Sequence, residues 1–159
     1  MKFDISIPNA REGMSAAVGS TRVAEIAEVA VLAEQLGFHG VWATDFLTPT
    51  ATYKIPDAGT PNWFEPIVCL AYCAALTRRV RLGTAVIMAP FRDPVILAKE
   101  VATLDQLSGG RVSLGLGVGM ARDEFVAIHP RRANIDRGRL LGEFIASFSA
   151  LMRHGDQKV

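Results

Sequence analysis

Hydrophobic and polar positions follow two periods that alternate along the chain. Short segments with strand-like patterning cover residues 2–7, 39–44, 80–88 and 111–117. A longer segment with a helical spacing of apolar side chains follows each of them, over residues 21–36, 62–77, 93–107 and 137–153. Strands that alternate with helices in this way predict an α/β domain with a parallel sheet and helices packed outside it.

Capping residues predict where the helices begin and end. Asn62 is followed by Glu65 at the spacing of a capping box, so we expect Asn62 to cap the second helix. Asp93 and Pro94 are typical of an N-cap and a first helical residue, and the glycines at 109–110 are expected to end the third helix.

The strand–helix units are similar in length, about 36 residues each, since the strands begin near residues 2, 39, 79 and 111. Eight such units would need about 290 residues, a usual size for a (β/α)8 barrel. The chain has 159 residues and holds four units. Two architectures therefore remain open, a four-stranded open α/β sheet and half of a barrel.

The composition is that of one globular domain. Hydrophobic residues make up 50% of the chain and charged residues 21%, and the formal net charge is +1. This near-neutral balance argues against nucleic acid or an anionic membrane as a partner. The longest apolar run is far shorter than the roughly 20 residues of a membrane-spanning helix, and the N-terminus lacks a signal-peptide pattern.

Two cysteines, Cys69 and Cys73, lie four positions apart on a predicted helix. Zinc takes about four ligands, so two thiols alone make a poor metal site, and we expect none. We interpret both as small buried residues of a reduced, cytoplasmic protein.

Five glycines lie within eleven positions, from Gly109 to Gly119, in the segment TLDQLSGGRVSLGLGVGM. Their spacing fits neither a dinucleotide fingerprint nor a P-loop. From residue 112 onward, bulky side chains alternate with serine or glycine, so one face of the strand is bulky and the other is almost bare. The bare face has two open interpretations: tight packing of a helix on the strand, or a cavity for a flat ligand at the strand's carboxyl end.

Three segments resemble the bacterial luciferase-like family in order and spacing. They are GFHGVWATDF (37–46), RLGTAVIMAPFRDP (81–94) and ATLDQLSGGRVSLGLGVG (102–119). The resemblance covers essentially the whole chain and implies a (β/α)8 TIM-type barrel. Residues 1–159 would then form a single domain, truncated after the fourth βα unit. The resemblance also implies a flavin- or deazaflavin-dependent oxidoreductase or monooxygenase that uses FMN or coenzyme F420 on a small organic substrate.

The same resemblance implies three places that face the cofactor. At the end of the second strand, Asp45 keeps an acidic position, although it could equally cap a turn, and Phe46 replaces an imidazole and cannot transfer a proton. The second place is a bulge at Thr84, Ala85 and Val86, where we expect a cis peptide bond between Ala85 and Val86. The third is the segment beside the ring, which comprises Gly117, Val118, Gly119 and Met120.

Met120 stands where some relatives have an acid, and a thioether cannot donate a proton, so we assign no catalytic residue. Asp105 and Arg111 are expected to form a buried or half-buried pair that joins the third helix to the fourth strand, and Glu124 is expected to be structural. The long polar loop over residues 45–61, with Tyr53 and the nearby Trp63, is a candidate for part of the substrate mouth.

Half of a barrel would leave two strand edges unpaired, so we expect the folded species to be a homo-oligomer, at least a dimer. A function of a different class also remains open. The chain could be a catalytically silent half-barrel or an assembly module, with weak or no cofactor binding.

Overall fold

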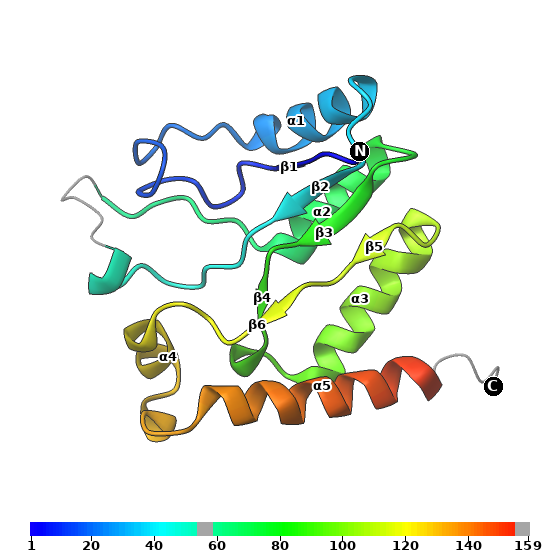
Figure 1. Cartoon of the computed structure of the whole chain (residues 1–159). Coiled ribbons are helices and arrows are strands. Elements are labelled where there is room, and N and C mark those ends of the chain that lie inside the picture. Colours follow the sequence, from blue (N-terminus) through cyan, green and yellow to red (C-terminus); the bar gives the residue numbers. More distant parts are fainter. Residues whose placement is uncertain (54–58, 155–159) are drawn as a thin grey trace.

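The computed structural model describes residues 1–53 and 59–154, and in them strands and helices alternate (Figure 1). The strands are β1 (Asp4–Ser6), β2 (Gly40–Ala43), β3 (Arg81–Thr84), β4 (Ile87–Met88), β5 (Val112–Ser113) and β6 (Leu116–Gly117). The α-helices are α1 (Val23–Gln35), α2 (Pro66–Leu76), α3 (Pro94–Ser108), α4 (Arg122–Ile128) and α5 (Arg137–His154). Short 3-10 helices are η1 (Ala51–Tyr53), η2 (Ala89–Phe91) and η3 (Pro130–Arg132). Positions 54–58 of the predicted loop and 155–159 of the predicted domain lie outside the described residues.

All strand pairs are parallel, which confirms the predicted α/β class. The main sheet has the order β1-β2-β3-β5, and β4 pairs with β6 in a second, two-stranded sheet. The described strands form an open arrangement, and none of the described residues closes them into a barrel. The segments 80–88 and 111–117, each predicted as one strand, are each divided into two short strands, because the backbone bulges at Ala85 and Val86.

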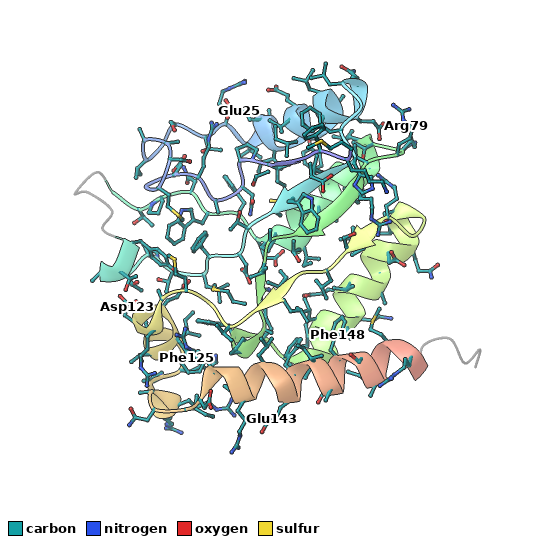
Figure 2. All side chains as sticks on the ribbon, viewed as in Figure 1. Glu25, Arg79, Asp123, Phe125, Glu143 and Phe148 are labelled. Carbon is teal, nitrogen blue, oxygen red and sulfur yellow. The ribbon has the colours of Figure 1, made fainter. Side chains whose placement is uncertain are left out.

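The core lies between the sheet and the helices that cover its outer face. Val41 of β2, Leu82 of β3 and Leu70 of α2 are completely buried in it. Helix α5 contributes its apolar side: Phe148 points toward the rest of the molecule, whereas Glu143 points away from it (Figure 2). None of the helices in the described part of the chain is long and apolar enough to cross a membrane.

Helix α3 has the predicted N-cap and first residue, and it ends at Ser108, one residue later than predicted. The carboxylate of Asp93 accepts hydrogen bonds from the backbone N–H groups of Val95 and Ile96, at 2.8 and 3.1 Å. Gly109 follows the helix in the left-handed conformation, with φ of 72°.

The prediction that Asn62 caps α2 is wrong. Helix α2 begins at Pro66, and its N-cap is Glu65, whose carboxylate accepts a hydrogen bond from the N–H of Val68 at 2.7 Å. Asn62 lies outside the helix because its backbone N–H donates to the buried carboxylate of Glu12, at 2.7 Å.

The predicted pair of Asp105 and Arg111 is also wrong. Asp105 accepts a hydrogen bond from the N–H of Val112 at 3.2 Å. Arg111 instead donates to backbone carbonyls at and beyond the C-terminal end of α2, including those of Ala74 and Thr77, at 3.1 Å each. The last carbonyls of a helix have no partner within the helix, so a nearby guanidinium satisfies them.

Candidate functional site

The backbone between β3 and β4 changes its pairing partner at the predicted bulge. The peptide bond between Ala85 and Val86 is cis, as expected from the sequence. The N–H of Ala85 donates to the carbonyl of Ala43 in β2, at 2.8 Å. Two residues later, the N–H of Ile87 donates to the carbonyl of Gly115, also at 2.8 Å. The bulge therefore lies where the backbone after β3 stops pairing with β2 and continues to pair with the strand that follows α3.

Thr84, at the start of the bulge, forms two hydrogen bonds with Gly115. Its hydroxyl group donates to the carbonyl of Gly115 at 2.9 Å and accepts a hydrogen bond from the N–H of the same residue at 3.0 Å. Thr84 is buried, whereas Val86 keeps 40% of its surface exposed. The bulge thus presents the side chain of Val86 at the carboxyl end of the sheet.

The glycines on the bare face of the fourth predicted strand make room for this bulge. A Cβ atom on Gly115 would lie 2.3 Å from the carbonyl oxygen of Thr84, and one on Gly117 would lie 2.6 Å from Cγ2 of Val86. Both distances are far below a normal contact. At Gly115 and Gly117, the space beside the strand is therefore filled by the bulge of the neighbouring strand. The sequence had left two other occupants open, a packed helix and a ligand cavity.

Gly119 differs from the other two because its own backbone requires a glycine. Its φ is +80°, and a Cβ atom there would lie 2.8 Å from Cε2 of Phe91. Beyond it, the carbonyls of Gly119 and Ala121 accept hydrogen bonds from the guanidinium of Arg137, at 3.1 and 3.3 Å. This role of Arg137 was not predicted from the sequence, although the residue opens the last predicted helix.

Apolar side chains are exposed at the ends of these strands. Val86 keeps 40% of its surface exposed before β4, and after β6 Val118 keeps 37% and Met120 keeps 66%. We refer to Val86, Val118 and Met120 together as the apolar ledge. Val86 precedes β4, whereas Val118 and Met120 follow the parallel strand β6. Two of the three places predicted to face a cofactor meet at Gly117, where a Cβ atom would lie 2.6 Å from Cγ2 of Val86.

The remaining place predicted to face the cofactor is Asp45, and both oxygens of its carboxylate already accept hydrogen bonds from other residues of the chain. One oxygen accepts a hydrogen bond from the N–H of Met88 at 3.0 Å, and the other pairs with the guanidinium of Arg92 at 2.7 Å. Only 2% of the residue is exposed. Asp45 therefore connects the segment after β2 to β4, the strand that follows the bulge, through the hydrogen bond from Met88.

An aromatic cluster follows Asp45. The rings of Phe46, Tyr53 and Trp63 contact one another, with centroids 5.1 to 5.3 Å apart. The hydroxyl of Tyr53 donates to the buried carboxylate of Glu124, and burial together with this carboxylate raises the pKa of Tyr53 above its usual range. Tyr53 therefore stays protonated at neutral pH.

Glu124 holds the loop that carries this cluster. Its carboxylate also accepts hydrogen bonds from the N–H groups of Leu47 and Thr48, at 2.8 and 3.2 Å. Glu124 is completely buried, which confirms the structural role expected for it. The loop after β2 is thereby fixed to α4.

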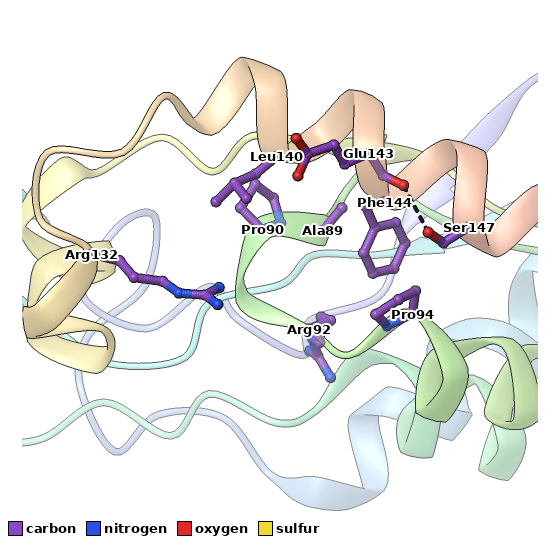
Figure 3. Close-up of a pocket in the computed structure, with 9 residues that line it drawn as sticks. All are labelled: Ala89, Pro90, Arg92, Pro94, Arg132, Leu140, Glu143, Phe144 and Ser147. Atoms are coloured by element: carbon purple, nitrogen blue, oxygen red, sulfur yellow. Dashed lines mark hydrogen bonds between the residues drawn. The ribbon is translucent and has the colours of Figure 1, made fainter.

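A pocket of about 230 Å³ lies elsewhere, between η2 and α5 (Figure 3). Its lining comprises Ala89, Pro90, Arg92, Pro94, Arg132, Leu140, Glu143, Phe144 and Ser147. None of the predicted site residues lines it.

A sequence model described as luciferase-like monooxygenase matches residues 1–158. The chain belongs to the luciferase-like monooxygenase family. Over 101 residues it is 38% identical to an F420-dependent glucose-6-phosphate dehydrogenase of Kineococcus radiotolerans, a match that covers 63% of this chain and 28% of the dehydrogenase. Over 129 residues it is 30% identical to the oxygenase component of a flavin-dependent trigonelline monooxygenase of Acinetobacter baylyi, covering 81% of this chain and 33% of that protein.

The fold is shared with a solved structure described as a type II Baeyer-Villiger monooxygenase. The oxygenating constituent of 3,6-diketocamphane monooxygenase from Pseudomonas putida, in complex with FMN, superposes with a TM-score of 0.73 at 20% identity, over 92% of this chain and 38% of that one. The chain thus spans less than half the length of each of these relatives. Their names include both F420 and a flavin, which confirms the expectation of either cofactor in the family and leaves the choice between them open.

Proposed function

We propose that this chain supplies part of the active site of a flavin- or F420-dependent oxidoreductase or monooxygenase that acts on a small organic substrate. The observation that carries the proposal is the bulge at Ala85 and Val86, which glycines of the neighbouring strand accommodate and which presents Val86 at the carboxyl end of β3 in a parallel sheet. Sites of α/β barrels lie at that end. The exposed apolar ledge fits one face of a planar ring, since a flat apolar ligand needs apolar side chains rather than charged groups against its face.

The proposed cofactor contacts come from two adjacent strand ends and from the end of β2. They comprise Asp45, Thr84, Ala85, Val86, Gly117, Val118, Gly119 and Met120. A bound FMN or F420 would supply the redox chemistry, and the residues of this chain would orient the ring and exclude water from one of its faces. Phe46 and Met120 cannot transfer protons, so none of this chain's residues is given an acid–base role.

The first test is equilibrium binding of FMN and of F420 to the chain, followed by fluorescence. We expect saturable binding of one of them with a dissociation constant in the range of about 1–100 µM, because only one face of the ring is contacted. Gly117→Ala should weaken that binding, since its Cβ atom would displace the side chain of Val86. Gly142→Ala is the matched control, because a Cβ atom at Gly142 meets nothing within 4 Å. No saturable binding of either cofactor would reject the proposal.

We also propose that the chain is half of a barrel and forms a homo-oligomer, at least a dimer. Among the described strands, β1 pairs only with β2 and β5 only with β3, so one edge of each is unpaired. Unpaired edges favour association with another strand. Light scattering should therefore give a mass of at least twice 17.2 kDa. A stable mass of 17.2 kDa at micromolar concentration would contradict this proposal.

A second candidate function is a catalytically silent half-barrel or assembly module. It is favoured by the phenyl ring of Phe46, which stands where the resemblance to the family implies an imidazole. Turnover of a reduced cofactor by the chain separates the two candidates, since the silent module would bind weakly or not at all and would show no turnover.

A further inference from the structure

Arg92 joins two carboxylates that come from different parts of the chain. Its Nη2 atom donates to Asp45 at 2.7 Å, and its Nη1 atom donates to Glu65 at 3.1 Å. The side chain is 16% exposed, and its Nε atom is buried without a hydrogen-bond partner among the described residues. The two carboxylates thus bind the two terminal nitrogens of the guanidinium. Only arginine has two such donors fixed in one plane.

Each of these two carboxylates also accepts a hydrogen bond from a backbone N–H group. Asp45 accepts from the N–H of Met88 in β4, two residues after the cis bond, and Glu65 accepts from the N–H of Val68 in the first turn of α2. Arg92 therefore connects the end of β2, the strand that follows the bulge and the start of α2. Burial lowers the pKa of Arg92, but Asp45 and Glu65 outweigh this effect and hold the pKa above its ordinary value.

Strand β4 has few backbone hydrogen bonds, although the side chains of Ile87 and Met88 are buried. It consists of two residues and, among the described strands, pairs with β6, through Ile87 opposite Leu116 and Met88 opposite Gly117. Without Arg92, the buried carboxylate of Asp45 would have no cation beside it, and a buried charge without a partner rotates toward water or takes up a proton. Either change weakens its hold on the N–H of Met88.

We propose that Arg92 is a positioning residue that sets the bulge, and with it Val86, at the place where the ring of the cofactor binds. The inference rests on the proposed function for the identity of the ligand. The hydrogen bonds that connect Arg92 to β4 through Asp45 do not depend on a ligand. Arg92 touches neither the ledge nor the ring in this assignment. It acts through Asp45 and the N–H of Met88.

The test compares Arg92→Met with Arg81→Met in the complete chain. Arg81 is the matched control because its Nε atom donates to Ser113 at 2.8 Å, at the opposite end of β3. Both variants should lower thermal stability. Only Arg92→Met should increase amide hydrogen exchange at Ile87 and Met88, and only Arg92→Met should weaken binding of the cofactor that the wild type binds, by about tenfold, with an altered visible spectrum of the bound cofactor.

Arg92→Lys keeps the proposal testable if Arg92→Met does not fold. A lysine is a point charge that cannot serve both carboxylates in one plane, so exchange at Met88 should be intermediate. Wild-type exchange at Met88 in both Arg92 variants, or a rise of equal size in Arg81→Met, would overturn the inference. If the wild type binds neither FMN nor F420, the proposed function fails, and amide exchange alone decides whether Arg92 sets β4.

Discussion

Replacing Gly115 with alanine is expected to lower the free energy of unfolding by about 3 kcal/mol, the upper part of the usual range for overpacking. The added Cβ atom would lie 2.3 Å from the carbonyl oxygen of Thr84. That oxygen belongs to the backbone, and the hydroxyl of Thr84 holds the same strand to Gly115 by two hydrogen bonds. Relief of the clash therefore requires β3 and the strand after α3 to separate.

Chemical denaturation of Gly115→Ala and Gly142→Ala measures this effect. Gly142 lies within α5 with open space around it, so alanine there should raise stability by up to about 1 kcal/mol through its better helix propensity. The explanation of the glycines as room for the bulge fails if Gly115→Ala is as stable as the wild type.

Glu12→Gln is expected to lower the free energy of unfolding at pH 7 by about 2–3 kcal/mol. The completely buried carboxylate accepts hydrogen bonds from the backbone N–H groups of Gly19, Thr21 and Asn62, at 2.9, 2.7 and 2.7 Å. A glutamine would turn an NH2 group toward at least one of these donors, which would lose its acceptor.

The same contacts give Glu12 a pH dependence of definite sign. Burial raises its pKa, but the hydrogen bonds from Asn62, Gly19 and Thr21 outweigh burial and lower the pKa from 4.5 to about 2. Because the folded pKa is the lower one, the contribution of Glu12 to stability is complete above the unfolded value of 4.5 and disappears as the pH falls toward 2.

Denaturation at several pH values between 7 and 2 checks both statements about Glu12. The stability difference between the wild type and Glu12→Gln should be largest at neutral pH and should shrink below pH 4.5. Glu143→Gln is the control. Among the described residues, the exposed carboxylate of Glu143 pairs with Arg139 alone, so its loss should change stability by less than about 0.5 kcal/mol. A pH-independent difference for Glu12→Gln would contradict the assignment.

The order and type of the main elements were predictable from the sequence. Alternating hydrophobic periods identified the parallel α/β class, and the capping pattern of Asp93, Pro94 and Gly109 placed the start of α3 correctly and its end to within one residue. Such features depend on residues within one or two turns of each other, so a local pattern is sufficient to predict them. The cis bond at Ala85 and Val86 came from the resemblance to the family and is confirmed by the structure.

The partners of the polar side chains were decided by the tertiary structure alone. Asp45 binds Met88 and Arg92, which lie more than 40 positions away, and Asn62 binds Glu12 across 50 positions. Local patterns carry no information about such pairs, and this is why Asn62 was wrongly predicted as a helix cap. The pair of Arg111 was misassigned for the same reason, because its acceptors are carbonyls of α2.

The glycine pattern shows most clearly which features follow from the local sequence and which depend on tertiary packing. The sequence by itself established that one face of the strand after α3 is bare, since successive side chains of a strand point to opposite faces. Only the tertiary structure decided what fills that face, because the answer is the backbone of Thr84 and the side chain of Val86, about 30 positions earlier in the chain. A missing side chain leaves a space, and the identity of its occupant depends on which segment the fold packs beside it.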